Sequence, residues 1–194
     1  MMNKQDIIHF FDSCAPHWDA NMVRNESAID SILNAGRIRE GIDVLDVACG
    51  TGVLFRDYLK RNVCTLTGID ISPKMVEVAK HNFPGVNVIC GDVEETDFEK
   101  GFDAIMIYNA FPHFPDPEKL IRCLSKLLNK NGTLTVAHGM SRTALQHHHS
   151  GAASCVSIDL LHEDKLSDIF TQCGLNIQAK ISDEEKYIVS GILP

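Results

Sequence analysis

The sequence predicts an α/β protein with a doubly wound, mostly parallel sheet. Short apolar segments alternate with segments of helical periodicity along most of the chain. The first apolar segment, 44–47, runs into a turn with two glycines, Gly50 and Gly52, and helix-compatible residues follow. The next apolar segment ends on Asp70, about 20 residues beyond the turn, where doubly wound folds have a functional carboxylate. Strand, glycine turn, helix, strand and terminal acid together indicate a βαβ unit.

The size and composition fit one soluble domain. The chain has 194 residues, of which 44% are hydrophobic and 23% are charged. These values are typical of a globular domain that is large enough to bury a core. The net charge of −8 argues against a nucleic-acid backbone as the main partner, because phosphate binding needs a basic surface. We therefore expect a small-molecule substrate and no nucleic-acid partner.

No targeting or membrane-spanning segment is expected. No run approaches the roughly 18 apolar residues of a membrane span, and the N-terminus lacks the apolar core of a signal peptide. The seven cysteines are scattered, without a Cys-x-x-Cys pair. In a chain without an export signal they are expected to be reduced thiols, so the sequence predicts a cytoplasmic protein.

The first 40 residues precede the first strand and are expected to form a helical cap. Ile7 and Phe11 belong to the apolar face of one helix, which is followed by a turn. A second helical stretch is expected near 26–35, where Ile29 and Ile32 share one side.

Five strands alternate with helices after this cap, and two further strands finish the chain. The expected strands are 44–47, 64–70, 86–90, 102–108 and 133–137, followed by an antiparallel edge hairpin of 175–180 and 187–192. The fourth strand is almost entirely apolar, as a central parallel strand should be. Helices are expected at 53–60, from Pro73 after the cap residue Ser72, from Pro117 after Asp116, and at 163–173 before Gly174.

The turn after the first strand has an informative spacing, Asp46-x-Ala48-x-Gly50-x-Gly52. A nicotinamide-binding turn would read Gly-x-Gly-x-x-Gly, and the third glycine is missing, so an oxidoreductase is the weaker alternative. The pattern resembles the nucleotide-binding loop of the class I S-adenosylmethionine-dependent methyltransferases. That family usually has glycine at the first small position, where this chain has Ala48, and a methyl side chain still permits a close turn.

The resemblance extends over about residues 40–193 and implies a Rossmann-like methyltransferase fold with seven strands and S-adenosyl-L-methionine as cofactor. In such folds the acid that ends the second strand binds the ribose hydroxyls. In the resembled family an acid after the third strand accepts from the adenine amino group, and the backbone of the next residue donates to the ring. The cofactor-binding residues that these matches predict are Asp46, Ala48, Gly50, Gly52, Asp70, Ile71, Asp92, Val93 and Asn109.

Two segments are expected to enclose the substrate. Residues 10–19 read Phe-Phe-Asp-x-x-Ala-x-x-Trp-Asp and resemble a cap of several small-molecule methyltransferases, which lies over the cofactor and helps to close the substrate pocket. An amphipathic helix packed on the edge of the sheet is the alternative. Residues 139–162 form an unusually long connection at the ligand edge. The predicted substrate pocket contains Phe11, Trp18, Phe111, Phe114 and His148.

Histidines are the candidate catalytic bases, because imidazole titrates near neutrality. His113 and His138 follow the fourth and fifth strands at the edge where open α/β sheets bind ligands, so both are predicted to be catalytic. His17 and the run 147–149 are weaker candidates, since a lone histidine more often has a surface or packing role. The run 147–149 could also belong to a metal site that Asp116 and Asn109 would join and that would orient an oxygen nucleophile. Consecutive side chains point in different directions and a single ion would draw on ligands from elsewhere, so the metal site is the less favoured alternative and no metal ligands are assigned.

The sequence thus predicts a single methyltransferase domain over 1–194. Its expected parts are a helical cap (1–40), a cofactor-binding core (41–137), a substrate-lid insert (138–162) and a C-terminal helix with edge strands (163–194). The acceptor is expected to be a small neutral or apolar molecule.

Several alternatives remain open for the function. A quinone-type carbon is one possible acceptor. A thiol or a metalloid is another, because Cys14, Cys49 and Cys155 lie near the expected pocket. A cofactor-binding sensor or an inactive scaffold also fits the sequence, because a fold does not establish turnover.

Overall fold

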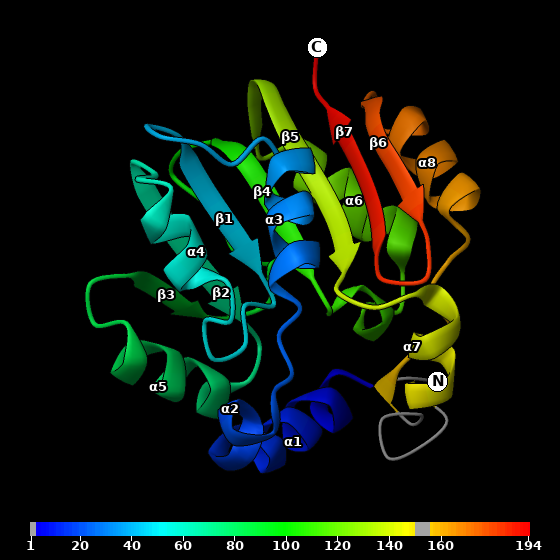
Figure 1. The fold of residues 1–194 in the computed structure, drawn as a ribbon. Helices are drawn as coiled ribbons and strands as arrows, with labels where there is room; N and C mark the ends of the chain where they lie inside the picture. The colour runs from blue at the N-terminus through cyan, green and yellow to red at the C-terminus, as the bar shows by residue number, and fades with distance from the viewer. Residues whose placement is uncertain (1–2, 150–155) are drawn as a thin grey trace.

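The computed structural model describes residues 3–149 and 156–194 and contains one seven-stranded sheet with helices on both faces (Figure 1). The strand order is β3-β2-β1-β4-β5-β7-β6. The first five strands of this order run parallel, while β7 pairs antiparallel with both β5 and β6. The predicted fold class, a doubly wound and mostly parallel sheet of seven strands, is therefore confirmed. The strands are β1 Asp43–Val47, β2 Thr65–Asp70, β3 Asn87–Cys90, β4 Phe102–Tyr108, β5 Leu128–His138, β6 Asn176–Ser182 and β7 Tyr187–Ile192.

The helices cover the sheet in two layers. Side chains of α3, α4 and α5 share one buried cluster with one face of the sheet, and those of α6 and α8 share another cluster with the opposite face. Two short 3₁₀ turns, Ala15–His17 and Phe111–His113, complete the regular structure. The helices are α1 Lys4–Cys14, α2 Trp18–Asn21, α3 Glu26–Ala35, α4 Phe55–Lys60, α5 Pro73–Asn82, α6 Pro117–Ser125, α7 Arg142–His149 and α8 Glu163–Gln172.

The central strands are apolar because both of their faces are buried. In β4, Ala104 and Met106 belong to the cluster with α3–α5, while Ile105 and Ile107 belong to the cluster with α6 and α8. Successive side chains of a strand point to opposite faces, so a strand between two helical layers has no position that favours a polar residue.

The predicted caps of two helices are confirmed. The Ser72 hydroxyl accepts a hydrogen bond from the Met75 backbone N–H (3.1 Å) at the start of α5. The Asp116 carboxylate accepts one from the Lys119 backbone N–H (2.9 Å) at the start of α6. Each bond satisfies a donor that the first helical turn cannot satisfy itself.

The structure differs from the sequence-based elements at three places. Residues 51–54 form turns, so α4 begins at Phe55 and not at residue 53. Strand β5 begins at Leu128, five residues earlier than expected, and has a register shift against β4. The connection after β5 contains α7, which was not predicted. Its first turn is capped by Ser141, whose hydroxyl accepts from the Ala144 backbone N–H (3.1 Å).

The topology opens a crevice at the carboxyl edge of the sheet. Strands β2 and β3 lie on one side of β1, and β4 and β5 lie on the other, so the connections leave in opposite directions between β1 and β4. Ligands of open α/β sheets bind outside the carboxyl ends of the strands at such a switch point. Figure 1 shows α1 and α2 across this edge.

Within the described ranges, none of the helices has the length and hydrophobicity that a membrane span requires. The cytoplasmic location stays a prediction.

Candidate functional site

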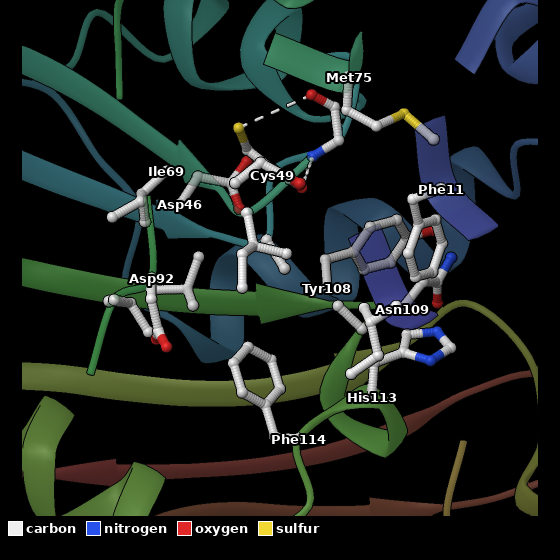
Figure 2. A pocket seen from close by; sticks show the side chains of 18 of the residues that line it. Phe11, Asp46, Cys49, Ile69, Met75, Asp92, Tyr108, Asn109, His113 and Phe114 are labelled. Atoms are coloured by element: carbon white, nitrogen blue, oxygen red, sulfur yellow. Dashed lines mark hydrogen bonds between the residues drawn. The ribbon is translucent and has the colours of Figure 1, made fainter. Parts of the chain in front are cut away.

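A pocket with a cavity volume of about 150 Å³ lies at the switch point, between the carboxyl ends of the strands and the N-terminal helices (Figure 2). Its walls come from four places: the glycine turn after β1, the ends of β2 and β3, the loop after β4, and α1 and α2. The lining residues that the sequence predicted are Phe11, Trp18, Asp46, Ala48, Gly50, Asp70, Ile71, Asp92, Val93, Asn109, His113 and Phe114.

Asp70 closes the glycine turn onto β2. One carboxylate oxygen accepts from the Gly50 backbone N–H (2.8 Å), and the other accepts from the Ser72 backbone N–H (2.8 Å). The side chain is buried, and burial raises its pKa to about 6, although these two N–H groups act in the opposite direction. Each oxygen has a second lone pair, so Asp70 retains the capacity to accept from a ligand.

Asp46 is a second buried acid that lines the same pocket, at the end of β1. Burial raises its pKa well above the ordinary range, and the charge of Asp70 raises it further. Two neighbouring buried carboxyls are unfavourable when both are ionised. A ligand that brings positive charge or hydroxyl donors into this pocket would stabilise their ionised forms.

We expect the stability of the ligand-free protein to fall as the pH rises from about 4 to about 6 because of Asp70. The folded protein holds a proton on Asp70 up to a pKa of about 6, whereas the unfolded chain releases it near 3.8. The contribution of Asp70 to the free energy of unfolding is therefore fully present below the pKa of the unfolded chain. It is lost as the pH rises through the pKa of the folded protein. The expected contribution is on the order of 3 kcal/mol.

Urea unfolding of the wild type and of Asp70→Asn across this pH window measures the effect. The difference in unfolding free energy between the two proteins should decrease with pH, because asparagine does not titrate. Parallel stability profiles would contradict the assignment.

The turn holds a non-glycine residue in a left-handed conformation. Ala48 has φ 53°, in the region that a Cβ disfavours. Asn109, at the end of β4, has φ 54°, and asparagine tolerates this region better. Both residues line the pocket. Unfavourable backbone conformations of this kind collect at functional sites, where the surrounding structure imposes them.

Ala48→Gly is expected to stabilise the fold by about 1 kcal/mol, because it removes the Cβ at a positive φ. In a chain of this length the midpoint of thermal unfolding should rise by about 2–4 °C. Ala79→Gly is the control: this residue is buried inside α5, and glycine there should lower the midpoint instead. A lower midpoint for Ala48→Gly would contradict the strained turn.

Gly52 supports the turn without lining the pocket. Its φ is 87°, and a Cβ there would lie 2.7 Å from the ring of Phe55. The position thus needs glycine both for backbone conformation and for the packing of α4 against the turn.

The N-terminal segment (residues 4–24) is fastened to the sheet edge by polar contacts. Lys4 forms an ion pair with Asp92 and a second one with Glu95 (3.0 Å). Two hydrogen bonds add to these ion pairs: Asp12 accepts from the Ser72 hydroxyl (2.6 Å), and Asp19 accepts from the Thr51 hydroxyl (2.6 Å). Arg24 also forms an ion pair with Asp57 (2.7 Å). These contacts span α1 to the residues after α2, so the segment closes the pocket from the side opposite the sheet.

His113 is held from two sides. Its Nδ1 lies 2.8 Å from the backbone oxygen of Val156 and 3.1 Å from the hydroxyl of Ser157. Its ring packs edge-on against Phe11, with 4.9 Å between the ring centroids. Figure 2 shows His113 and Phe11 together at the end of the pocket away from Asp92.

Of the predicted site residues whose side chains the structure describes, Gly52, Phe111 and His138 do not line this pocket. His138 is fully buried, with its ring 6.3 Å from that of Tyr187, and Phe111 is buried in the core. Gly52 is described above. His148 belongs to α7, but its side chain lies outside the described part of the structure.

Several lining residues were not predicted from the sequence. Tyr108 is the last residue of β4, so its place at the carboxyl edge was a usable signal. Lys4, Ile7, Met22 and Met75 come from helices or their ends, and only the fold brings them to the pocket. No group of three or more potential metal ligands occurs among the residues that the structure describes.

Residues 45–136 match a family model described as "Methyltransferase domain". The chain is 31% identical over 140 residues to a malonyl-[acyl-carrier protein] O-methyltransferase of Priestia megaterium, a match that covers 69% of this chain and 51% of the relative. It is 25% identical over 152 residues to the ubiquinone/menaquinone biosynthesis C-methyltransferase UbiE of Campylobacter jejuni, covering 70% and 64%. The chain thus spans between about half and two thirds of the length of these two relatives.

Solved structures share the fold over nearly the whole chain. The magnesium protoporphyrin IX methyltransferase ChlM from Synechocystis, with bound S-adenosylhomocysteine, has a TM-score of 0.76 and 17% identity, with 99% of this chain and 100% of that chain covered. The [4+2]-cyclase SpnF has a TM-score of 0.79 and 16% identity, with 100% and 97% covered. The family model and the sequence relatives, together with this fold, show that the chain belongs to the class I S-adenosylmethionine-dependent methyltransferase family, whose cofactor is S-adenosylmethionine.

Proposed function

We propose that this protein is an enzyme that binds S-adenosylmethionine and directs its methyl group to a small-molecule acceptor. One observation carries the proposal: the buried acids Asp46 and Asp70 and the glycine turn line a pocket that continues to His113 and a group of aromatic side chains. The first part suits a nucleoside with a positive charge, and the second part offers room for an acceptor beside it.

The residues of the first part fit the cofactor. Asp70 can accept from the two ribose hydroxyls with the lone pairs that Gly50 and Ser72 leave available. The pKa of Asp46 is raised by burial and by Asp70, so a sulfonium and an ammonium group nearby would favour its ionised form.

The remaining cofactor contacts are assigned by the position of each residue along the pocket wall. We assign Asp92 and Val93 to the adenine, Ile71 to the ribose side, and Ala48, Gly50 and Asn109 to the methionine portion. The Asn109 side chain already accepts from the Gly139 backbone N–H (2.9 Å), so its contribution would be to shape the wall at the end of β4.

When bound, S-adenosylmethionine supplies a methyl group on a positively charged sulfur, and the carbon–sulfur bond breaks as the bond to the acceptor forms. The protein's task is to hold the acceptor in line with that bond and to exclude water. We assign the exclusion of water to the N-terminal segment and the orientation of the acceptor to the loop after β4, in keeping with a cap over residues 1–40 and a core over 41–137.

A metalloid or thiol acceptor bound by cysteines receives little support. Cys49 is the one cysteine among the described residues that line the pocket. Burial raises its pKa well above the usual range, so it is a protonated thiol and a poor metal ligand. Cys14 does not line the pocket, and Cys155 lies outside the described residues.

A binding protein without methyl transfer is the second candidate. The [4+2]-cyclase SpnF has the same fold, so the fold does not establish this reaction.

Calorimetry with S-adenosylmethionine and S-adenosylhomocysteine tests the proposal first, with a reduced nicotinamide dinucleotide as the control ligand. We expect one site for each of the first two ligands and none for the control. Incubation with S-adenosylmethionine and a panel of phenols, quinones and thiols should then release S-adenosylhomocysteine. Failure to bind either nucleoside would overturn the proposal. Tight binding without product from any acceptor would favour the sensor.

A further inference from the structure

The pocket is divided into a charged half and an uncharged half. Its charged lining residues come from the ends of the strands β1–β3 and from Lys4, which pairs with Asp92. The wall after β4 is uncharged and consists of Tyr108–Ala110 and His113–Pro115. Strand β4 lies beside β1, on the other side from β2 and β3, so the half proposed for the cofactor and the half proposed for the acceptor lie on different sides of β1.

Aromatic rings enclose the uncharged half, which we call the aromatic chamber (Phe11, Trp18, Tyr108, His113 and Phe114). The centroid of the Phe11 ring lies 5.8 Å from that of Trp18 and 4.9 Å from that of His113, and both pairs pack edge-on. Figure 2 shows Phe11, Tyr108 and His113 toward one end of the pocket and Phe114 along its side, between His113 and Asp92. Flat apolar molecules suit such walls, because ring pairs gain from offset and edge-on contacts.

Among the residues that the structure describes, the aromatic chamber has no lysine or arginine to pair with an anionic acceptor. Of the lining residues that the structure describes, Lys4 is the one cation, and it contacts Asp92, Glu94 and Glu95 in the charged half. A carboxylate or phosphate in the chamber would lose its hydration without gaining a partner, which is costly. The acceptor is therefore expected to enter without charge.

The tautomer of His113 is fixed by its neighbours. A backbone carbonyl can only accept, so the contact of Nδ1 with the Val156 oxygen (2.8 Å) requires a proton on Nδ1. The Ser157 hydroxyl reinforces this contact from 3.1 Å. The Ile158 backbone N–H also donates to the Pro112 carbonyl (2.8 Å), which ties the strap 156–158 to the loop that carries His113. A neutral imidazole in this tautomer has its basic lone pair on Nε2.

We propose that the acceptor is an uncharged aromatic compound with a hydroxyl group, which occupies the aromatic chamber and loses its proton to Nε2 of His113. This inference rests on the proposed function. The hydroxyl oxygen gains the methyl group, its proton passes to His113 and then to solvent, and the sulfur leaves as a neutral thioether. A phenol with a pKa of about 10 is almost fully protonated at neutral pH, so a base is useful there.

The class of acceptor is tested by binding to the complex with S-adenosylhomocysteine. The matched probes are phenol and 2-naphthol, which are neutral, and benzoate and 2-naphthoate, which carry a charge in place of the hydroxyl. Quenching of Trp18, the one tryptophan of the chain, reports binding, and calorimetry confirms it. We expect each neutral probe to bind at least about tenfold more tightly than its anionic partner, because the chamber offers an anion no counter-charge. Equal or tighter binding of the anions, or no binding of either neutral probe, would overturn the proposal.

Two variants locate the probe. Phe114→Ala should weaken the binding of 2-naphthol about tenfold and leave S-adenosylhomocysteine unaffected. Phe98→Ala is the control, since Phe98 packs against Phe102 and does not line the pocket. Because S-adenosylhomocysteine binding is measured separately, loss of the nucleoside site and loss of the acceptor site are distinguishable. If both variants weakened the binding of 2-naphthol equally, the aromatic chamber would not be the binding site of the acceptor.

The role of the strap 156–158 has a readout that does not require turnover. Nitrogen-15 correlation spectra of the protein at a pH where His113 is neutral should show the proton on Nδ1, not on Nε2. Ser157→Ala should increase the fraction of the other tautomer, and Ser157→Thr should restore the original one. His81, an exposed histidine at the end of α5, should show no change in either variant. A proton on Nε2 of His113 in the wild type would overturn its role as base.

Discussion

Asp70→Ala is expected to weaken the binding of S-adenosylmethionine by about 1.5–3 kcal/mol, the usual value of charge-assisted hydrogen bonds. This corresponds to a dissociation constant that is roughly 10–150 times higher. The carboxylate holds the glycine turn, through the Gly50 N–H, and also lines the pocket as an acceptor. Its removal takes away the ribose contacts and loosens the turn at the same time.

Calorimetry with Asp70→Ala, Asp70→Asn and Asp97→Ala separates these effects. Asparagine keeps the shape of the side chain, so its loss of affinity reports mainly on the charge. Asp97 is exposed and does not line the pocket, so Asp97→Ala changes the net charge equally and should bind normally. An unchanged dissociation constant for both Asp70 variants would remove this residue from the cofactor site.

His113→Ala is expected to lower kcat by about 10²–10⁴-fold with a hydroxyl acceptor, which is the usual contribution of a general base. The dissociation constant for S-adenosylhomocysteine should change little, because His113 lies in the half of the pocket away from the acids. His81→Ala should have normal activity.

The decrease of kcat in His113→Ala should depend on the acidity of the acceptor. An acceptor that is already ionised at the assay pH needs no base, so kcat should fall less for a more acidic phenol than for a less acidic one. An equal loss for both would indicate that His113 positions the acceptor and does not take its proton.

Much of the fold was predictable because the local patterns agree with the global arrangement. The bounds of β4 follow from an apolar run that is buried on both faces, and the start of α5 follows from Ser72 and Pro73. Helix α7 was missed because its residues lie in a long connection, where the only local signal was the cap residue Ser141.

The site was predictable where it belongs to the strand ends and not where the fold brings distant segments together. Asp46 and Asp70 lie at the carboxyl ends of β1 and β2, and Asp92 follows β3, so their order along the chain was enough to predict a shared pocket. His138 also stands at a strand end, but its side chain points into the core beside Tyr187. Residues 132–138 are buried on both faces of the sheet, so this part of the strand has no polar alternation that would show which way its last residue points.

The polar contacts that hold the N-terminal segment against the sheet edge affect how fast a ligand can enter the pocket. The N-terminal segment lines the pocket on the side opposite the sheet, so we expect a nucleoside to enter faster when the polar contacts of this segment loosen. Its ties to the sheet edge are polar, and the Lys4 pairs with Asp92 and Glu95 are partly exposed. Dissolved salt weakens such pairs, so stopped-flow recordings of Trp18 fluorescence should show nucleoside entry accelerating with ionic strength. Lys4→Gln should be fast already in dilute buffer, and a salt response as steep as that of the wild type would contradict this role of Lys4.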